Sequence, residues 1–215
     1  MENLTIEEAR AWYQDADPVH DFDHVLRVYR VAERIARAEG ADLQIVQTAA
    51  LLHDSQGSAP GASGNARAEH HIASAEFAGE VLKAKGWPEE KIKAVQHCIR
   101  AHRFRGKEDA PETLEAKILF DADKLDVLGA IGAARTVAYA ALDNQPVYAE
   151  PSQQFLSTGI KEVDEPHSSY HEFLFKLRKV KDRLFTKTGK SLAEARHVYL
   201  VEFYNQLSAE VRGER

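Results

Sequence analysis

Apolar residues recur every three or four positions along most of this chain, which is the spacing of one face of an α-helix. One such stripe runs through Val28, Val31 and Ile35, and another runs through Ile92 and Val95. No stretch alternates apolar and polar residues clearly enough to favour a β-strand. The pattern therefore predicts an all-α protein.

Capping residues indicate where the helices begin. Thr5 and Glu8 fit a capping box, and Asp17-Pro18 and Asp42 are typical helix starts. We expect a short helix from residue 5 and longer ones over about 17–39, 42–54, 67–85, 88–102, 112–142, 168–185 and 191–211.

Two stretches rich in Gly, Ser and Pro, at 55–65 and about 143–166, interrupt this series and are expected to be irregular. A chain of 215 residues is long enough for one substantial core and short for two. We expect a single domain over 1–215. Its helical core would span about 18–142, with C-terminal helices at about 167–211 packed against that core.

The composition excludes several classes of protein. The 28 basic and 34 acidic residues give a net charge of −6, so no basic field favours nucleic acid. No apolar run approaches the roughly 20 residues of a membrane span, and the N-terminal residues do not resemble a signal peptide. The single cysteine, Cys98, rules out an internal disulfide and a cysteine-based zinc site. These features favour a cytoplasmic enzyme that binds neither nucleic acid nor membrane.

Histidine and aspartate occupy positions where an apolar side chain would be buried at lower cost. His24 lies four residues before Val28 and so falls on the first stripe. His102 continues the second stripe toward the C-terminus at the same spacing. His53 and Asp54 are adjacent at the predicted end of a helix, where the turning backbone lets both side chains converge. Such groups need a mutual network or a metal ion to compensate their burial. Two imidazoles and two carboxylates suit a divalent metal with positions open for water and substrate.

Three aspartates in the long apolar helix are candidates for the remaining carboxylate. Asp123 shares a helical row with Asp126, whereas Asp121 shares one with Ile118 and Leu125. Helical spacing alone does not choose among the three.

Three ordered segments carry these residues: 20–28 (HDFDHVLRV), 49–54 (AALLHD) and 121–126 (DADKLD) with the glycines that follow. In this set the chain resembles the HD-domain metal-dependent phosphohydrolases, and most closely their small bacterial YedJ/YpgQ-type subgroup. The similarity extends into the C-terminal half through 168–171 (SSYH) and 196–197 (RH). The resemblance implies a single all-α HD-domain helical bundle.

Carried over to this chain, the resemblance implies four metal ligands: His24, His53, Asp54 and Asp123. It thereby favours Asp123 among the three aspartates. The implied cofactor is one divalent ion, with manganese, iron, nickel, zinc, cobalt and magnesium all compatible.

The other histidines match the metal-ligand positions of the family less closely. The pair His20-Asp21 precedes the ligand of the first motif and is not the metal-binding pair. Binuclear members of the family take further histidines from the middle helices. His70, His71 and His102 are available here, but their spacing does not match a clean second site, so we expect one metal.

The chain departs from the family directly after the HD pair, where some members carry lysine or glutamate and this sequence has Ser55 and Gln56. A cation for the substrate phosphate must then come from elsewhere. Arg27, Arg67 and Lys124 are the candidates, each with the alternative of a solvated helix charge.

The implied reaction is hydrolysis of a phosphate ester or anhydride by metal-activated water, with Arg27 and Lys124 assisting catalysis. Asp54 is the candidate to accept the proton of that water. His20 and Asp126 are candidates to orient an imidazole or contact substrate, or are satisfied surface groups. His102 either assists or is a core histidine.

The resemblance makes a nucleotide the leading substrate, with release of phosphate or pyrophosphate left open, and it says nothing of oligomeric state. Two alternatives are a di-iron oxygenase on the same scaffold and a non-catalytic nucleotide sensor. One metal site argues against the first, and an intact set of four ligands argues against the second.

Overall fold

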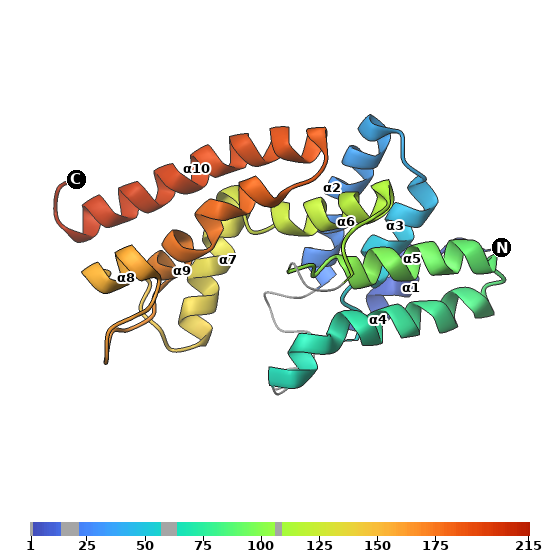
Figure 1. The fold of residues 1–215 in the computed structure, drawn as a ribbon, viewed down its shortest axis with the longest axis horizontal. Coiled ribbons are helices and arrows are strands. Elements are labelled where there is room, and N and C mark those ends of the chain that lie inside the picture. Colours follow the sequence, from blue (N-terminus) through green and yellow to red (C-terminus); the bar gives the residue numbers. More distant parts are fainter. Residues whose placement is uncertain (1, 14–21, 57–63, 106–108) are drawn as a thin grey trace. The chain divides into compact units, whose positions relative to one another are not determined.

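The computed structural model describes residues 2–13, 22–56, 64–105 and 109–215. All regular structure among these residues is helical, which confirms the all-α prediction (Figure 1). The helices are α1 (Ile6–Arg10), η1 (Ala11–Tyr13), α2 (Phe22–Glu39), α3 (Leu43–Leu52), α4 (Gly64–Ala84), α5 (Glu89–Ala101), α6 (Leu114–Leu125), α7 (Gly129–Leu142), α8 (Gln153–Thr158), α9 (Ser169–Phe175), η2 (Leu177–Arg183) and α10 (Lys187–Val211).

The chain forms two compact units. The first comprises Met1–Asp123 with Phe185–Gly189, and the second comprises Lys124–Leu184 with Lys190–Arg215. The expectation of a single domain over 1–215 remains a prediction.

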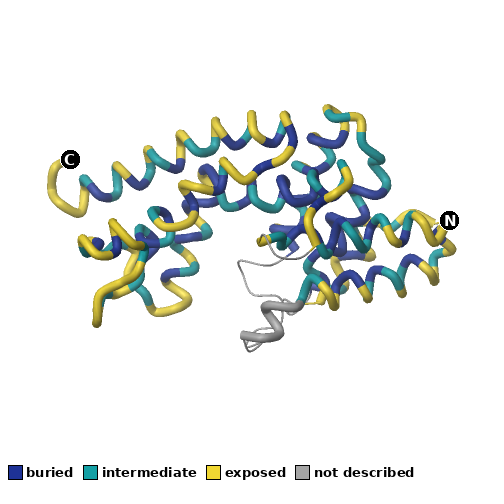
Figure 2. Tube along the Cα trace, in the orientation of Figure 1, coloured by how far each residue is buried: buried dark blue, intermediate teal, exposed yellow. Residues whose placement is uncertain are grey.

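Helix α3 is the central element of the first unit, since it contacts α1, α2, α4 and α5. Its residues Val46, Ala49, Ala50 and Leu52 are fully buried. Helices α4 and α5 lie side by side, and each alternates buried with exposed positions (Figure 2). Because α3 ends at Leu52, the most buried helix of this unit delivers the next two residues, His53 and Asp54, into its interior.

Two of the helix starts proposed from capping residues agree with the structure. Thr5 and Glu8 form the predicted capping box, and the Asp42 carboxylate accepts hydrogen bonds from the first backbone amides of α3. The proposed start at Asp17-Pro18 lies outside the described residues. Gly40 ends α2 with a φ of 75°, a left-handed conformation that favours glycine.

The predicted helix over 112–142 is wrong, because the chain breaks between Leu125 and Gly129 into α6 and α7. The amides of Val127 and Leu128 bond three residues back, to Lys124 and Leu125, so the α-helical ladder ends there. Gly129 then adopts a φ of 72°. A side chain at that position would be strained by this conformation.

Two further boundaries differ from the prediction. The stretch at 143–166 contains a short helix, α8, which Ser152 caps and which ends at Gly159 with a φ of 75°. Helix α10 starts at Lys187 rather than near Ser191, because Thr186 Oγ1 accepts a hydrogen bond from the Gly189 amide. The helix expected over 168–185 is divided into α9 and the 3₁₀ helix η2.

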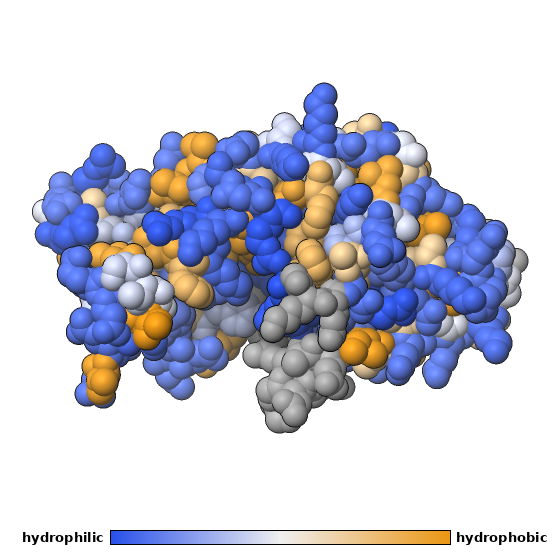
Figure 3. Space-filling view, in the orientation of Figure 1, coloured by the Kyte–Doolittle hydropathy of each residue, from blue (hydrophilic) through white to orange (hydrophobic). Residues whose placement is uncertain are grey.

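The face of the molecule seen in Figure 3 is mostly hydrophilic, with apolar groups in separate small patches. Within the described parts of the chain, no single helix is long and apolar enough to cross a membrane. Helices α6 and α7, which are bent at the break between them, reach the length and apolar composition of a membrane span only when they are counted together.

Candidate metal centre

The end of α3 is held so that His53 and Asp54 point to the same place. The carbonyl of Ala50 accepts a hydrogen bond from His53 Nδ1 at 2.8 Å, and that of Leu51 accepts one from the Tyr13 hydroxyl at 2.9 Å. These carbonyls belong to the last turn of the helix, where no intrahelical donor remains. His53 Nε2 consequently faces Asp54 Oδ2 at 3.5 Å. The predicted convergence of the two neighbours is confirmed.

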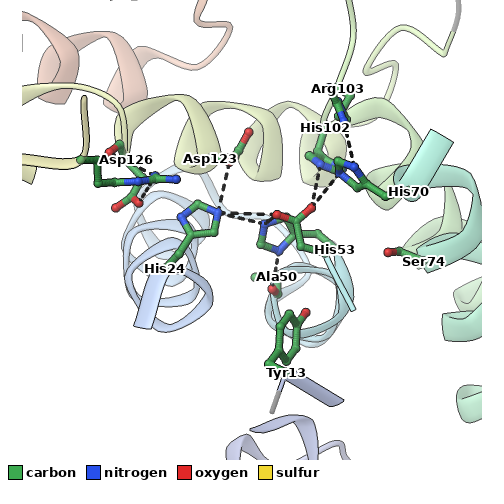
Figure 4. A network of polar contacts seen from close by, with 12 residues as sticks. Tyr13, His24, Ala50, His53, His70, Ser74, His102, Arg103, Asp123 and Asp126 are labelled. Atoms are coloured by element: carbon green, nitrogen blue, oxygen red, sulfur yellow. Dashed lines mark hydrogen bonds and ion pairs between the residues drawn. The ribbon is translucent and has the colours of Figure 1, made fainter. Parts of the chain in front are cut away.

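His24 and Asp123 approach the same point from α2 and α6 (Figure 4). His24 Nε2 lies 3.4 Å from His53 Nε2, 3.5 Å from Asp123 Oδ1 and 3.8 Å from Asp54 Oδ2. His24 is buried, as its place on the α2 stripe predicts, while Asp54 and Asp123 remain slightly exposed. His24 Nε2 thus lies within 4 Å of His53 and of both carboxylates, and His24, His53 and Asp123 are close enough to form one group of candidate metal ligands.

The other two aspartates of the 121–126 segment have different partners. Asp121 is fully buried, and its carboxylate accepts hydrogen bonds from the amides of Phe185 and Thr186 and from the Thr186 hydroxyl. Asp126 forms an ion pair with Arg135 at 2.5 Å. Asp123 lies 3.5 Å from His24 Nε2, and its role as a metal ligand remains a prediction.

Two more histidines face the other carboxylate oxygen of Asp54. His70 Nε2 lies 3.0 Å from Asp54 Oδ1, and His102 Nε2 lies 3.4 Å from it. His102 Nδ1 donates to the carbonyl of Ile99 at 2.5 Å, as His53 does to Ala50. Asp54, His70 and His102 are therefore close enough to form a second group of candidate metal ligands beside His24, His53 and Asp123.

Burial and neighbouring charge set the protonation of this cluster. Burial alone would raise the pKa of Asp54, but the electrostatic effect of His53 and the contacts of His102 and His70 outweigh it and hold the pKa well below its usual range. Burial lowers the pKa of His102 to about 4, against the opposing effect of Asp54. At neutral pH Asp54 is a carboxylate and His102 is a neutral imidazole, the forms that bind metal.

The donor set fits a divalent ion. Metal–ligand bonds of about 2.0–2.2 Å place neighbouring ligand atoms roughly 3 to 3.5 Å apart. The separations of 3.4 and 3.5 Å from His24 Nε2 to His53 and Asp123 lie in that range. Because His53 Nδ1 carries the proton that bonds to Ala50, its Nε2 presents a lone pair. A backbone carbonyl that fixes the imidazole in this way is typical of metal-binding histidines.

The structure leaves several predicted site residues untested. His20 and the side chain of Arg67 lie outside the described residues. Arg27 is half-buried on α2, one turn after His24, and Lys124 is half-buried in the last turn of α6. Their roles remain predictions, as does that of Asp126.

His70 is the residue of this cluster that the sequence analysis set aside. It lies on a buried stripe of α4 that continues through Ser74, Ala78 and Leu82, each four residues after the last. That stripe, followed back from Leu82, was the signal that could have placed His70 inside.

Comparison with known proteins identifies the scaffold. A family model described as HD domain matches residues 21–128, half of the chain. The chain belongs to the HD domain family. The resemblance seen in the sequence is therefore confirmed. This HD-domain protein is 32% identical to YpgQ of Bacillus subtilis over 96% of its own length and 94% of that protein.

Solved structures support the same assignment. The structure of B. subtilis YpgQ in complex with ADP matches with a TM-score of 0.74 at 30% identity, covering 97% of this chain and 99% of YpgQ. An HD-superfamily hydrolase from Bacillus thuringiensis matches with a TM-score of 0.69 at 29% identity, covering 96% and 94%. Lin1889 from Listeria innocua matches with a TM-score of 0.71 at 26% identity, covering 96% and 95%. The protein has an HD-superfamily hydrolase fold.

Proposed function

We propose that this HD-domain protein is a metal-dependent phosphohydrolase that cleaves a phosphate ester or anhydride of a nucleotide. The approach of His53, Asp123 and Asp54 to His24 Nε2, at 3.4, 3.5 and 3.8 Å, is the observation that carries the proposal. These four residues would hold one divalent ion. When bound, such an ion supplies positive charge to phosphoryl oxygens and makes water more acidic.

The protein's own groups have separate tasks in this proposal. Asp54 is ionised at neutral pH and is close to the entry of the 55–65 stretch, so it can take up a proton from the attacking water. His53 and His24 face that carboxylate from one side, at 3.5 and 3.8 Å. Arg27 and Lys124 would neutralise substrate phosphate, with Arg67 as the further candidate. His20, His102 and Asp126 would orient neighbouring groups or contact substrate.

Similarity to other proteins supports the substrate class. YpgQ, which this chain matches over nearly its whole length, has been solved in complex with ADP. A nucleoside diphosphate offers both anhydride and ester bonds, so the comparison leaves open which bond breaks.

The proposal is tested by assaying metal-depleted protein against nucleoside mono-, di- and triphosphates, each with added manganese, magnesium, cobalt or nickel. We expect turnover of at least one nucleotide that requires metal and stops with chelator. Separate detection of phosphate and pyrophosphate identifies the bond. Nucleotide binding without turnover under every metal would instead indicate a sensor, and neither binding nor turnover would contradict both readings.

A further inference from the structure

Arg103 fixes which nitrogen of His70 carries the proton. Its guanidinium Nη1 lies 2.8 Å from His70 Nδ1 (Figure 4). A guanidinium has only donors, so His70 Nδ1 must accept with its lone pair. The proton of the neutral ring is then on Nε2, which lies 3.0 Å from Asp54 Oδ1. His70 therefore presents an N–H, not a lone pair, to Asp54.

His53 and His102 have the opposite arrangement. In both, Nδ1 donates to a backbone carbonyl, of Ala50 and Ile99, so that Nε2 presents a lone pair. Histidines that bind metal are generally held in this way. If His70 bound metal through Nε2, its Nδ1 would carry the proton and would face the N–H of Arg103. Two donors at 2.8 Å repel each other, so the Arg103 contact and metal binding by His70 exclude one another.

We propose that Arg103 is a positioning residue that limits the centre to one metal ion. By holding His70 as a donor to Asp54, it removes one of the three ligands that Asp54, His70 and His102 would otherwise offer. Its own positive charge, one imidazole away, also disfavours a second cation. The Nε2–H of His70 faces Asp54 Oδ1, while Asp54 Oδ2 faces His24 and His53. The inference rests on the proposed metal site and specifies its stoichiometry.

The test is the number of manganese ions bound per chain, measured by elemental analysis after equilibration with excess Mn²⁺, on Arg103 variants. Arg103→Glu replaces the donor by an acceptor that can take the Nδ1 proton of His70, so it should raise the count from one to two. Arg103→Lys keeps donor and charge and should stay at one. Adding His70→Ala to Arg103→Glu should return the count to one. Electron paramagnetic resonance provides a second readout, since two neighbouring Mn²⁺ ions couple and one does not.

Arg103→Gln, whose amide oxygen also accepts, serves as the second variant if Arg103→Glu does not fold; circular dichroism checks folding in each case. Two ions in the wild type, or one ion in every folded variant, would overturn the role of Arg103 while leaving the proposed function intact. A wild type that binds no manganese would overturn the proposed function, and this inference with it.

Discussion

Asp121, Asp123 and Asp126 lie within six positions of one another, yet each carboxylate has a different partner. The Asp121 carboxylate accepts hydrogen bonds from two backbone amides just before α10. Asp123 lies beside His24, and Asp126 forms an ion pair with Arg135. Helical spacing could not separate them, because the partners of Asp121 come from more than 60 positions along the chain. The family resemblance favours Asp123, because it compares positions along a motif and does not depend on helical spacing.

Replacing Asp121 should therefore destabilise the protein without removing a metal ligand. Asp121→Ala leaves the part-buried amide of Phe185 and the buried amide of Thr186 without their acceptor. We expect a loss of about 2–4 kcal/mol in the free energy of unfolding. Denaturant unfolding measures it, with exposed Asp143→Ala as the control, which should change stability by less than about 0.5 kcal/mol. Equal stability of the two variants would show that the Asp121 contacts contribute little.

Arg27 and Lys124 test phosphate neutralisation. Alanine at either position should preserve metal content and lower nucleotide turnover, because a phosphate beside one divalent ion still carries uncompensated charge that a cation offsets in the transition state. The loss of one such contact is worth about 2–4 kcal/mol, or roughly 30- to 1000-fold in rate. Metal analysis and steady-state kinetics on the same preparations decide the matter. Normal turnover in both variants would show that Arg27 and Lys124 are solvated helix charges, and Arg67 would then be the next candidate to bind the substrate phosphate.

At the scale of elements, the sequence predicted helices well and their ends less well. Periodicity located α2, α5 and α10, because each has one apolar stripe that faces the core, and the run of apolar residues after Asp42 located α3. It joined α6 to α7, since apolar residues continue across a break that depends on backbone turns and on the left-handed Gly129. It also missed α8, although Ser152 and Gly159 carry the capping signals.

Glu165 is the residue that secures the segment around α8. Its carboxylate accepts hydrogen bonds from the amide and hydroxyl of Ser152, from the Glu162 amide and from buried His171. Burial would raise the pKa of Glu165, but the Ser152 amide, His171 and the other donors lower it from 4.5 to about 2. Ionised Glu165 therefore stabilises the folded state above about pH 4.5, and this contribution is lost as the pH falls toward 2.

Glu165→Gln should accordingly be less stable than the wild type near neutral pH, with the difference shrinking between pH 4.5 and 2. Thermal unfolding across that range provides the measurement. The matched control is Glu162→Gln, whose side chain is exposed and should give a difference that does not depend on pH in this way. A constant stability difference for Glu165→Gln from pH 5 to 2 would contradict the assigned pKa.

At the scale of the whole molecule, the predicted family and all-α fold are confirmed, and the similarity to YpgQ covers nearly the full chain. The sequence indicated His24 and His53-Asp54 because histidine and aspartate stood on apolar stripes or at a helix end. It could not show that His70 and His102 both face Asp54, since α4 and α5 are brought to α3 only by packing. Nor could it show the Arg103 contact, which depends on the direction of two side chains.

The most direct test of the metal centre is the metal content of the Asp54→Ala protein, measured together with its nucleotide hydrolysis. Wild type should bind one divalent ion per chain, and Asp54→Ala and His53→Ala should lose most of it along with nearly all hydrolysis. His97→Ala, at a histidine on α5 outside the cluster, is the matched control and should keep both. Full metal occupancy in folded Asp54→Ala would contradict the assignment of this residue as a ligand, and with it the central claim.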